Sequence, residues 1–259
     1  MVSLKHLVRE AHKESAHPKI VTGPHTRWLE LPEAEQHYSK EAIEHVIRVL
    51  TKKHQTKRSG RFSPSALGEC HRKVLFSYGD WPQAGYDPDV LDLMGLGNWG
   101  HLRWQAEGLT DGWMVQAEIY VADRLFPMGG TMDGVLVDGS VFELKTVNNF
   151  IFKQQVDVDD EPKHSHLLQV HAYMRMAKKR LASILYEERS SGQYHEFRVE
   201  WDDAIMDELV DLIDLLTGYV EIDELPEMLD ECKNLTGRTF KGCPFRKICP
   251  KATTVRMPG

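Results

Sequence analysis

The sequence lacks the features that mark membrane, secreted and repetitive proteins. Its 259 residues contain no apolar run long enough for a membrane helix, no signal-peptide core, no internal repeat and no low-complexity segment. We therefore expect a cytoplasmic protein that does not bind a membrane. Positive charge is also scarce, because the formal net charge is -7. A sequence-independent nucleic-acid coat protein would be basic, although a local basic groove is enough for DNA binding.

Cysteine is scarce and unevenly placed. Of the four cysteines, Cys70 stands alone, whereas Cys232, Cys243 and Cys249 lie near the C-terminus among Gly, Pro, Lys and Arg. Disulfides are not expected in a reducing cytosol. Four thiolates can instead hold a tetrahedral zinc ion or an iron–sulfur cluster. Four small buried apolar side chains are the alternative interpretation.

The most informative stretch runs from residue 130 to residue 146 and reads GTMDGVLVDGSVFELKT. It predicts two short β-strands on either side of a turn at Asp138-Gly139. A three-residue loop with Gly139 at positive φ would pair Val135 with Val141. A two-residue turn would shift that register by one residue. We predict the three-residue loop because it brings two carboxylates and an ammonium group together on one face.

In that register Asp133 lies opposite Glu143, and Lys145 shares a face with Glu143. Two adjacent carboxylates repel each other unless a cation lies between them, and such oxygen ligands suit Mg²⁺ or Mn²⁺. An ion there can polarise a phosphoryl oxygen and acidify a water molecule, which Lys145 can orient. An exposed hairpin with scattered charges is the alternative for this pattern on its own.

Apolar periodicity and turn residues predict the remaining elements of an α/β fold. Helices are expected at 36–56, from Ser63 to Tyr78, and at 89–109, 148–156, 162–178 and 202–220; strands are expected at 114–122, 181–187 and 196–201. Residues 1–35 suggest a solvated, partly ordered arm, and the chain from Pro226 suggests loops. A basic cluster with Lys57, Arg58 and Arg61 follows the first helix and is a candidate for phosphate contacts; a merely solvated run of charge is the alternative.

Five features, in this order, resemble the PD-(D/E)xK nuclease superfamily and, within it, the Cas4 and RecB-type exonuclease branch. They are CHRKVLFSY with Cys70 and Arg72; Gly100-His101; GTMDGV and FELKT with Asp133, Glu143 and Lys145; QVHAY with Gln169 and Tyr173; and GCPFRKICP with Cys243 and Cys249. The resemblance covers about residues 63–250. It implies a restriction-endonuclease-like core with a mixed central sheet flanked by helices. Residues 1–62 would form an N-terminal arm with a basic helix, and residues 63–259 the nuclease domain.

The resemblance also implies roles for individual residues. His101, Asp133, Glu143 and the Leu144 carbonyl would bind Mg²⁺ or Mn²⁺; Asp133, Glu143, Lys145, Gln169 and Tyr173 would form the catalytic set; Arg72, with Lys57, Arg58 and Arg61, would contact DNA. Lys145 would position the attacking water. Gln169 and Tyr173 would hold either the lysine or the DNA strand. Glu118, on the preceding strand, could assist.

A [4Fe–4S] cluster is implied by the cysteines, held in a small helical subdomain built from about residues 63–80 and 226–250. In the family pattern the second cysteine stands three residues before the third, a position that Phe240 occupies here. Either a loop still delivers Cys232 to the cluster, or the site is degenerate. We expect the loop, with Cys70, Cys232, Cys243 and Cys249 as ligands and zinc as the rival metal.

The expected function is that of a metal-dependent DNA exonuclease acting on single-stranded or frayed ends in recombination, repair, replication or spacer capture. Recombination, helicase or integrase proteins would be suitable partners. The alternatives are a DNA-end-binding module that acts with a partner and a structure-specific endonuclease of the same superfamily. The intact Asp133, Glu143 and Lys145 favour an enzyme.

Overall fold

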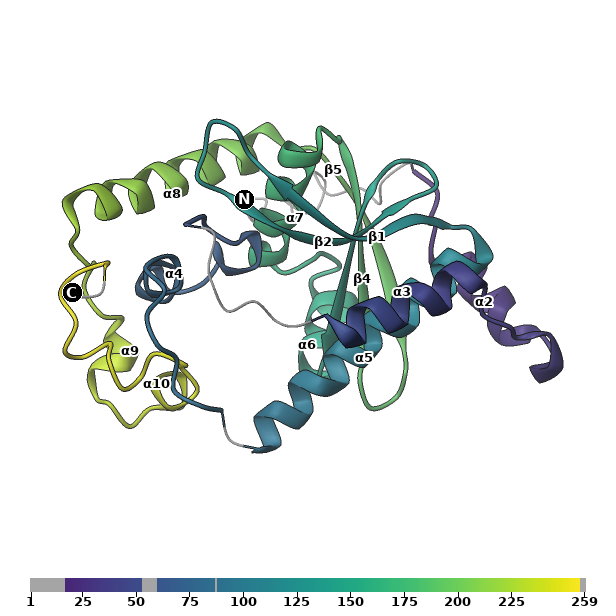
Figure 1. Ribbon diagram of the computed structural model, residues 1–259, viewed down its shortest axis with the longest axis horizontal. Helices are drawn as coiled ribbons and strands as arrows, with labels where there is room; N and C mark the ends of the chain where they lie inside the picture. Colours follow the sequence, from purple (N-terminus) through teal and green to yellow (C-terminus); the bar gives the residue numbers. More distant parts are fainter. Residues whose placement is uncertain (1–16, 53–59, 87, 257–259) are drawn as a thin grey trace, which may run out of the picture.

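The computed structural model describes residues 17–52, 60–86 and 88–256. Its centre is a five-stranded sheet in the order β1-β2-β3-β4-β5. The strands are β1 (Met114–Ala122), β2 (Gly129–Leu136), β3 (Val141–Val147), β4 (Leu181–Glu188) and β5 (Tyr194–Glu200). β3 and β4 are parallel and the other neighbours are antiparallel, so the sheet is mixed, as predicted (Figure 1).

Helices surround this sheet. They are α2 (Thr22–Glu30), α3 (Lys40–Thr51), α4 (His71–Tyr78), α5 (Pro88–Asp111), α6 (Asn149–Lys153), α7 (His164–Ala177), α8 (Asp203–Ile222), α9 (Asp230–Lys233) and α10 (Arg238–Lys241). Short 3₁₀ turns cover Glu33–Glu35 and Pro64–Ala66, and a π-helical turn, Gln154–Val158, continues α6. In the described part of the chain no helix is both long and apolar enough to cross a lipid bilayer.

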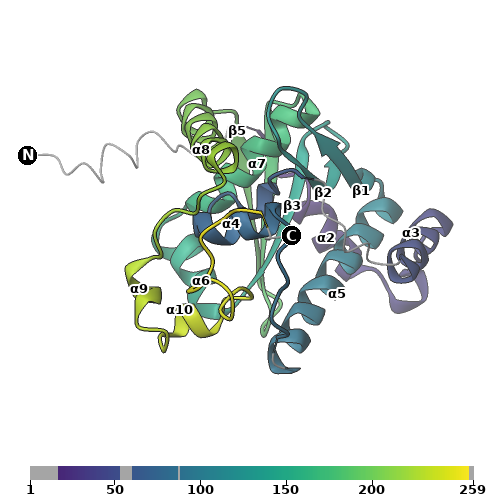
Figure 2. The same ribbon diagram turned by 60° about the vertical axis from the view of Figure 1, so that its left-hand side comes forward.

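Alternating side chains of the central strands bury both faces of the sheet. One set packs with α7 and the other packs around Trp104 of α5. The first set includes Val141, Ile184 and Tyr186, and the second includes Phe142, Leu144 and Leu185. Helix α7 therefore covers one face and α5 the other, as can be followed in Figure 2.

The β2–β3 hairpin has the predicted register. Val135 pairs with Val141, and Gly139 has a φ of 83°. The Leu136 N–H donates to the Ser140 carbonyl at 2.9 Å, which closes a three-residue loop. Gly139 supplies the left-handed backbone conformation that this loop requires at no steric cost. The same register, extended along the strands, sets Asp133 opposite Glu143.

The helix predicted from Ser63 to Tyr78 is wrong in its first half. A 3₁₀ turn and a loop come first, and α4 begins only at His71, directly after Cys70. The loop crosses the start of α7 so closely that a Cβ on Gly68 would lie 2.2 Å from the Cβ of Ser165. This tertiary contact, which local periodicity cannot reveal, replaces the expected helical turns.

Residues 17–35 are more firmly held than the solvated, partly ordered arm that the sequence suggested. The Glu196 carboxylate accepts hydrogen bonds from the backbone N–H groups of Ile20, Val21 and Thr22 at 2.9–3.1 Å. One turn later, the buried His25 binds the buried Glu107 of α5 at 2.7 Å. Two buried carboxylates therefore fix α2 against the sheet. His6 and His12, part of the same expectation, lie outside the described residues.

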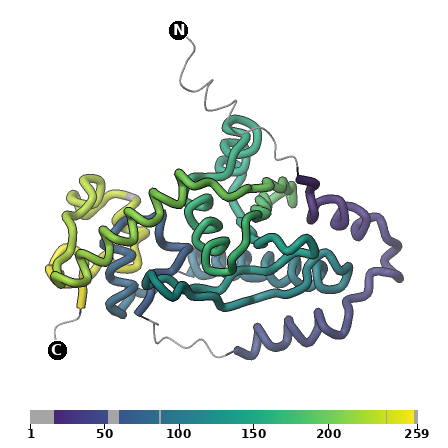
Figure 3. The backbone as a smooth tube through the Cα atoms, turned by 90° about the horizontal axis from the view of Figure 1, so that it is seen from above, coloured from purple at the N-terminus to yellow at the C-terminus, as the bar shows by residue number. Residues whose placement is uncertain are grey.

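Two segments that lie far apart in the sequence meet at one end of the molecule. Figures 1 and 3 show α4 beside α9, α10 and the C-terminal segment, although α4 lies more than 150 residues earlier in the chain. The buried Arg72 of α4 joins them by donating to the carbonyl oxygens of Pro226, Cys249 and Ala252 at 2.6–2.7 Å.

Candidate nuclease site

A cleft of about 400 Å³ lies where β2 and β3 meet α5 and α7. Its lining includes every residue predicted to bind the divalent metal or to act in catalysis: His101, Asp133, Glu143, Leu144, Lys145, Gln169 and Tyr173. These residues come from three segments of the chain, so the sheet and its two covering helices create the site. Ser63 and Ser65 also line it.

Asp133 is held from two sides. Its Oδ2 accepts a hydrogen bond from the Leu144 N–H at 2.8 Å. Its Oδ1 lies 3.1 Å from Nδ1 of His101. Burial of His101 disfavours its charge, but the negative charges of Asp133 and Glu143 outweigh that effect and raise its pKa to about 9. The imidazolium therefore occupies the place beside Asp133 that a metal ion would compete for.

Glu143, Lys145 and Gln169 form a closed triangle of hydrogen bonds. Lys145 Nζ donates to Glu143 Oε1 at 2.8 Å and to Gln169 Oε1 at 2.6 Å. Gln169 Nε2 donates to the same Glu143 oxygen at 2.7 Å. Burial, with the nearby Asp133 carboxylate, raises the pKa of Glu143 to about 7. The triangle fixes the ammonium group without using the second Glu143 oxygen.

That second oxygen, Glu143 Oε2, is buried and has no hydrogen-bond partner. A buried carboxylate oxygen is costly unless a donor or cation satisfies it. Together with the Asp133 carboxylate and the adjacent Leu144 carbonyl, it supplies the hard oxygen donors that Mg²⁺ or Mn²⁺ prefers. Within the described residues no three His, Cys, Asp or Glu side chains converge as a metal-binding group. Each carboxylate is instead turned toward a cationic neighbour, His101 or Lys145.

Tyr173 lies one turn of α7 beyond Gln169 and faces the same cleft. Its hydroxyl donates to the Thr131 carbonyl at 2.8 Å. Burial and the nearby carboxylates raise its pKa, so it stays a neutral donor. It ties α7 to β2.

His166 also lies on α7, but it is not among the residues that line the cleft. Its spacing from Gln169 and Tyr173 places it on the same side of α7. Its Nδ1 lies 2.5 Å from the Tyr186 hydroxyl, which also accepts from the Lys163 N–H at 3.0 Å. Burial and the charge of Lys145 lower its pKa to about 3.

Of the four basic residues predicted to contact DNA, the two that the structure describes, Arg61 and Arg72, do not line the cleft. Arg72 is buried, and its two terminal nitrogens are committed to backbone carbonyls, which argues against the phosphate contact predicted for it. Arg61 donates through Nη1 to the Asp123 and Met128 carbonyls and supports the loop before β2. Lys57 and Arg58 lie outside the described residues.

The four cysteines line a single cavity of about 410 Å³ between α4 and the C-terminal segment. All four are free. Burial raises the pKa of Cys232, Cys243 and Cys249, and the other thiols of the cavity contribute to each increase. The loop through α9 thus brings Cys232 to the same cavity as Cys70, although the thiols do not converge as a metal-binding group in the described structure.

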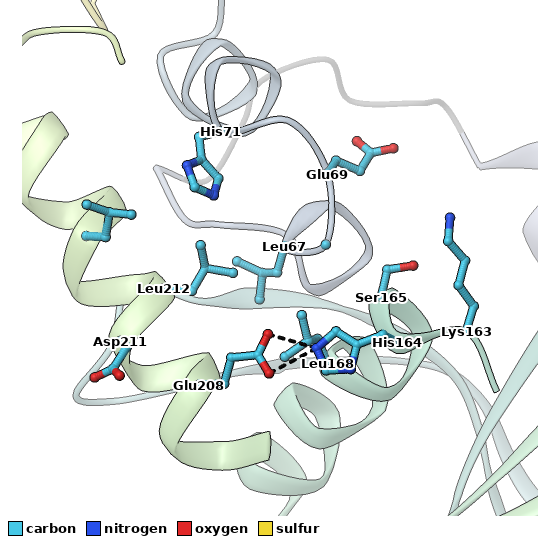
Figure 4. A pocket seen from close by; sticks show the side chains of 12 residues that line it. Leu67, Glu69, His71, Lys163, His164, Ser165, Leu168, Glu208, Asp211 and Leu212 are labelled. Atoms are coloured by element: carbon cyan, nitrogen blue, oxygen red, sulfur yellow. Dashed lines mark hydrogen bonds and ion pairs between the residues drawn. The ribbon is translucent and has the colours of Figure 1, made fainter. Parts of the chain in front are cut away.

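A further hollow of about 570 Å³ lies between residues 67–71, the start of α7 and α8 (Figure 4). Its rim carries Glu69, Glu208 and Asp211, and both Glu208 oxygens bind His164 at 2.8–2.9 Å. His71, Lys163 and His164 line it as well, so its charge is mixed. The carboxylates and the lysine singled out by the sequence, Asp133, Glu143 and Lys145, line the smaller cleft at β2 and β3 instead.

No family model matches the sequence, and no curated protein matches it significantly. Among solved structures, the fold is similar to that of an alkaline exonuclease (LHK-Exo) from Laribacter hongkongensis. The identity is 16%, the TM-score is 0.51, and the similarity covers 64% of this chain and 90% of that one. A structure of LHK-Exo in complex with dAMP gives 15% identity and a TM-score of 0.51, covering 63% of this chain and 89% of the other. The chain thus shares the core fold of an exonuclease.

Proposed function

We propose that this protein is a metal-dependent DNA exonuclease of the PD-(D/E)xK type that degrades DNA from single-stranded ends. The observation that carries the proposal is the cleft in which Asp133, Glu143 and Lys145 lie together, with one buried Glu143 oxygen unbonded. The fold shared with LHK-Exo supports DNA as the substrate. The dAMP bound to that enzyme is a single nucleotide, which favours stepwise release of nucleotides.

Asp133, Glu143, the Leu144 carbonyl and His101 are the groups that would hold the divalent ion. When bound, Mg²⁺ or Mn²⁺ supplies charge stabilisation at a phosphoryl oxygen and makes water more acidic. His101 must give up its proton to serve as a ligand, since only the neutral imidazole binds metal. Its raised pKa therefore predicts proton release when the metal binds.

Lys145 would orient the attacking water and stabilise negative charge that develops on the phosphate. Gln169 fixes the ammonium by accepting one of its hydrogen bonds. In the reaction the water oxygen bonds to phosphorus and gives up a proton, the opposite P–O bond breaks, and the departing oxygen takes up a proton from solvent, so that one water molecule is consumed for each bond cleaved. Tyr173 holds β2 and α7 together around this position.

Substitution of Asp133 tests the proposal directly. Asp133→Ala should abolish cleavage of a linear single-stranded DNA in Mg²⁺ or Mn²⁺ and leave DNA binding largely intact. Asp138→Asn is a matched control, because Asp138 lies in the same hairpin but outside the cleft. Normal cleavage by Asp133→Ala would refute the catalytic assignment. Binding without cleavage by the unmodified protein would favour the DNA-end-binding module.

A circular single-stranded DNA separates the two enzymatic readings. An exonuclease needs an end and should leave the circle intact, whereas a structure-specific endonuclease of the same superfamily would cut a circle that carries its target structure. The predicted branch favours the exonuclease. Recombination, helicase or integrase proteins would be suitable partners for an enzyme that acts at DNA ends.

We further propose a Cas4-like or RecB-like assignment in which Cys70, Cys232, Cys243 and Cys249 hold a [4Fe–4S] cluster. The shared cavity of these four thiols supports it, because they come from the two chain segments that the family pattern predicts. Purification without oxygen should give a coloured protein with about four irons per chain. A colourless protein with zinc would favour a tetrahedral site instead.

A further inference from the structure

A chain of hydrogen bonds, buried at its centre, runs from the exposed Arg48 of α3 to the strand that carries Asp133. Nη2 of Arg48 lies 2.9 Å from Nδ1 of His45, and Nε2 of His45 lies 2.9 Å from Oε1 of Gln105. Nε2 of Gln105 donates to the Asp133 carbonyl at 3.0 Å and to Oε1 of Glu118 at 3.1 Å. His45 and Gln105 are 4% and 1% exposed, so water cannot substitute for these contacts.

The direction of each bond follows from its end groups. Arginine can only donate, so Nδ1 of His45 accepts and Nε2 carries the proton. The Asp133 carbonyl can only accept, so the Gln105 amide must turn its NH₂ group toward β2. The Gln105 oxygen then faces His45. Each group in this series of hydrogen bonds therefore has one consistent role as donor or acceptor, and both N–H donors of Gln105 end on the strands β1 and β2.

The series of hydrogen bonds ends at a strained residue of β1, Glu118. Glu118 has a φ of 54° inside β1, a left-handed conformation that is uncommon for a residue other than glycine. The neighbouring pairs Ala117–Gly134 and Ile119–Met132 place it opposite Asp133. Backbone strain of this kind persists only where surrounding contacts enforce it. Gln105 is the contact that binds both Glu118 and Asp133.

We propose that Gln105 is a positioning residue for Asp133 and Glu118, and that His45 on α3 fixes its orientation. The expected effect of Gln105 on cleavage rests on the proposed nuclease function, whereas its structural role does not. It makes α3, which precedes the segment resembling the nuclease family, part of the machinery that holds the site. It also explains why Gln105 and His45, two polar side chains, are buried between α3 and the sheet.

Gln105→Met tests this role because methionine keeps the shape and removes all three hydrogen bonds. Thr110→Val is the matched control. It lies on the same helix and removes a different contact with α3, the bond from the Ser39 N–H to Thr110 Oγ1 at 3.0 Å. If Gln105 only held α3 against α5, the two variants would have the same effect on the Asp133 carboxylate.

The first measurement needs no metal and no substrate. The Leu144 N–H is bonded to Asp133 Oδ2, so its hydrogen exchange reports whether that carboxylate is held in place. Gln105→Met should exchange this amide at least about 10-fold faster than the unmodified protein, with core amides of α7 unchanged. Thr110→Val should leave it protected. Equal protection in all three proteins, or equal loss in both variants, would overturn the proposal.

The second measurement is Mn²⁺ affinity, followed by electron paramagnetic resonance. Gln105→Met should weaken binding about 10- to 100-fold, as is typical when a partner that orients metal ligands is removed. The rate constant for cleavage should fall while KM for DNA changes little. Failure of the unmodified protein to cleave DNA would refute the proposed function alone, since amide exchange still tests Gln105. If Gln105→Met does not fold, His45→Asn should give a smaller change of the same kind, and its absence would refute the role of α3.

Discussion

At the scale of single residues, the cleft is organised by how each polar atom is satisfied. Gln169 accepts a hydrogen bond from Lys145 through its oxygen and donates one to Glu143 through its NH₂ group, so it sets the distance between the two charges. Among the buried side-chain nitrogen and oxygen atoms of the described residues that line the cleft, Glu143 Oε2 is the one without a partner. A site that satisfies its own lysine but leaves one carboxylate oxygen open is suited to a cation that arrives from outside.

Gln169→Leu should therefore lower kcat about 10- to 100-fold and change KM for DNA little, because it frees Lys145 without removing a substrate contact. The measurement is steady-state cleavage of single-stranded DNA in Mn²⁺. His164→Gln, on the first turn of the same helix, is the control. A raised KM with unchanged kcat would show instead that Gln169 contacts the DNA strand.

The dependence of stability on pH should involve His171, a buried histidine of α7 that lies outside the cleft. Nε2 of His171 accepts from the Asp202 N–H at 3.0 Å, and its Nδ1 lies 2.8 Å from the Leu167 carbonyl. Nδ1 donates to that carbonyl in either protonation state, but only the neutral ring can accept at Nε2. Burial lowers the pKa of His171 below its value of 6.5 in the unfolded chain. The unfolded state then binds the proton more readily, so the contribution is present above pH 6.5 and is lost as the pH falls below it.

The free energy of unfolding should accordingly fall by at most about 1.4 kcal/mol for each pH unit below 6.5 through this group. His171→Gln keeps one donor and one acceptor but cannot titrate. Its unfolding free energy, measured with urea between pH 5 and 7.5, should decline less steeply than that of the unmodified protein. Parallel curves would assign the acid sensitivity to other groups, such as His166.

At the scale of elements, the hairpin could be predicted and the segment before it could not. Gly139 fixes a local loop type, and the register of β2 and β3 follows from that loop. The helix expected from Ser63 fails because Gly68 must pass against Ser165, about a hundred residues later. Likewise, α2 is ordered by Glu107 and Glu196, which no local pattern connects to residues 17–30.

The candidate site shows the same division. Its residue types and order could be predicted, because each motif is short and lies on one strand or helix turn. The placement of Arg72 could not, because its partners are backbone carbonyls that carry no sequence signal. Gln105 and His45 were missed for a related reason, since their spacing resembles that of any buried helix face.

Arg72 should act as a structural clamp between α4 and the C-terminal segment. Arg72→Lys keeps the charge but cannot reach three carbonyls, so it should lower the free energy of unfolding by about 2 kcal/mol. Lys73→Ala is the neighbouring control, and its exposed pair with Glu69 should matter by less than about 0.5 kcal/mol. Urea unfolding of both variants measures the difference. A DNA-affinity defect in Arg72→Lys without loss of stability would restore the predicted phosphate contact.

At the scale of the whole molecule, one loop connects the two chemical centres. Ser63 and Ser65 line the nuclease cleft, and Cys70, at the end of the same loop, lines the cysteine cavity. The cavity is also lined by Cys232 of α9, Phe240 of α10 and Cys249 of the C-terminal segment. A metal or cluster held by the thiols would therefore stabilise a loop that borders the cleft, although the two hollows share no lining residue.

Cys232 decides whether this closure involves all four thiols, because its spacing departs from the family pattern. Cys232→Ser and Cys243→Ser should lose iron equally and each unfold more readily by about 4 kcal/mol, comparable to opening a long covalently closed loop. Thr239→Val, in the same cavity, should retain iron. Iron content and thermal unfolding after purification without oxygen measure both effects. If Cys232→Ser keeps its iron while Cys243→Ser loses it, the cluster has another fourth ligand and the loop through α9 is only structural. The Asp133 site should still bind Mn²⁺ in either variant, because none of its residues lines the cysteine cavity.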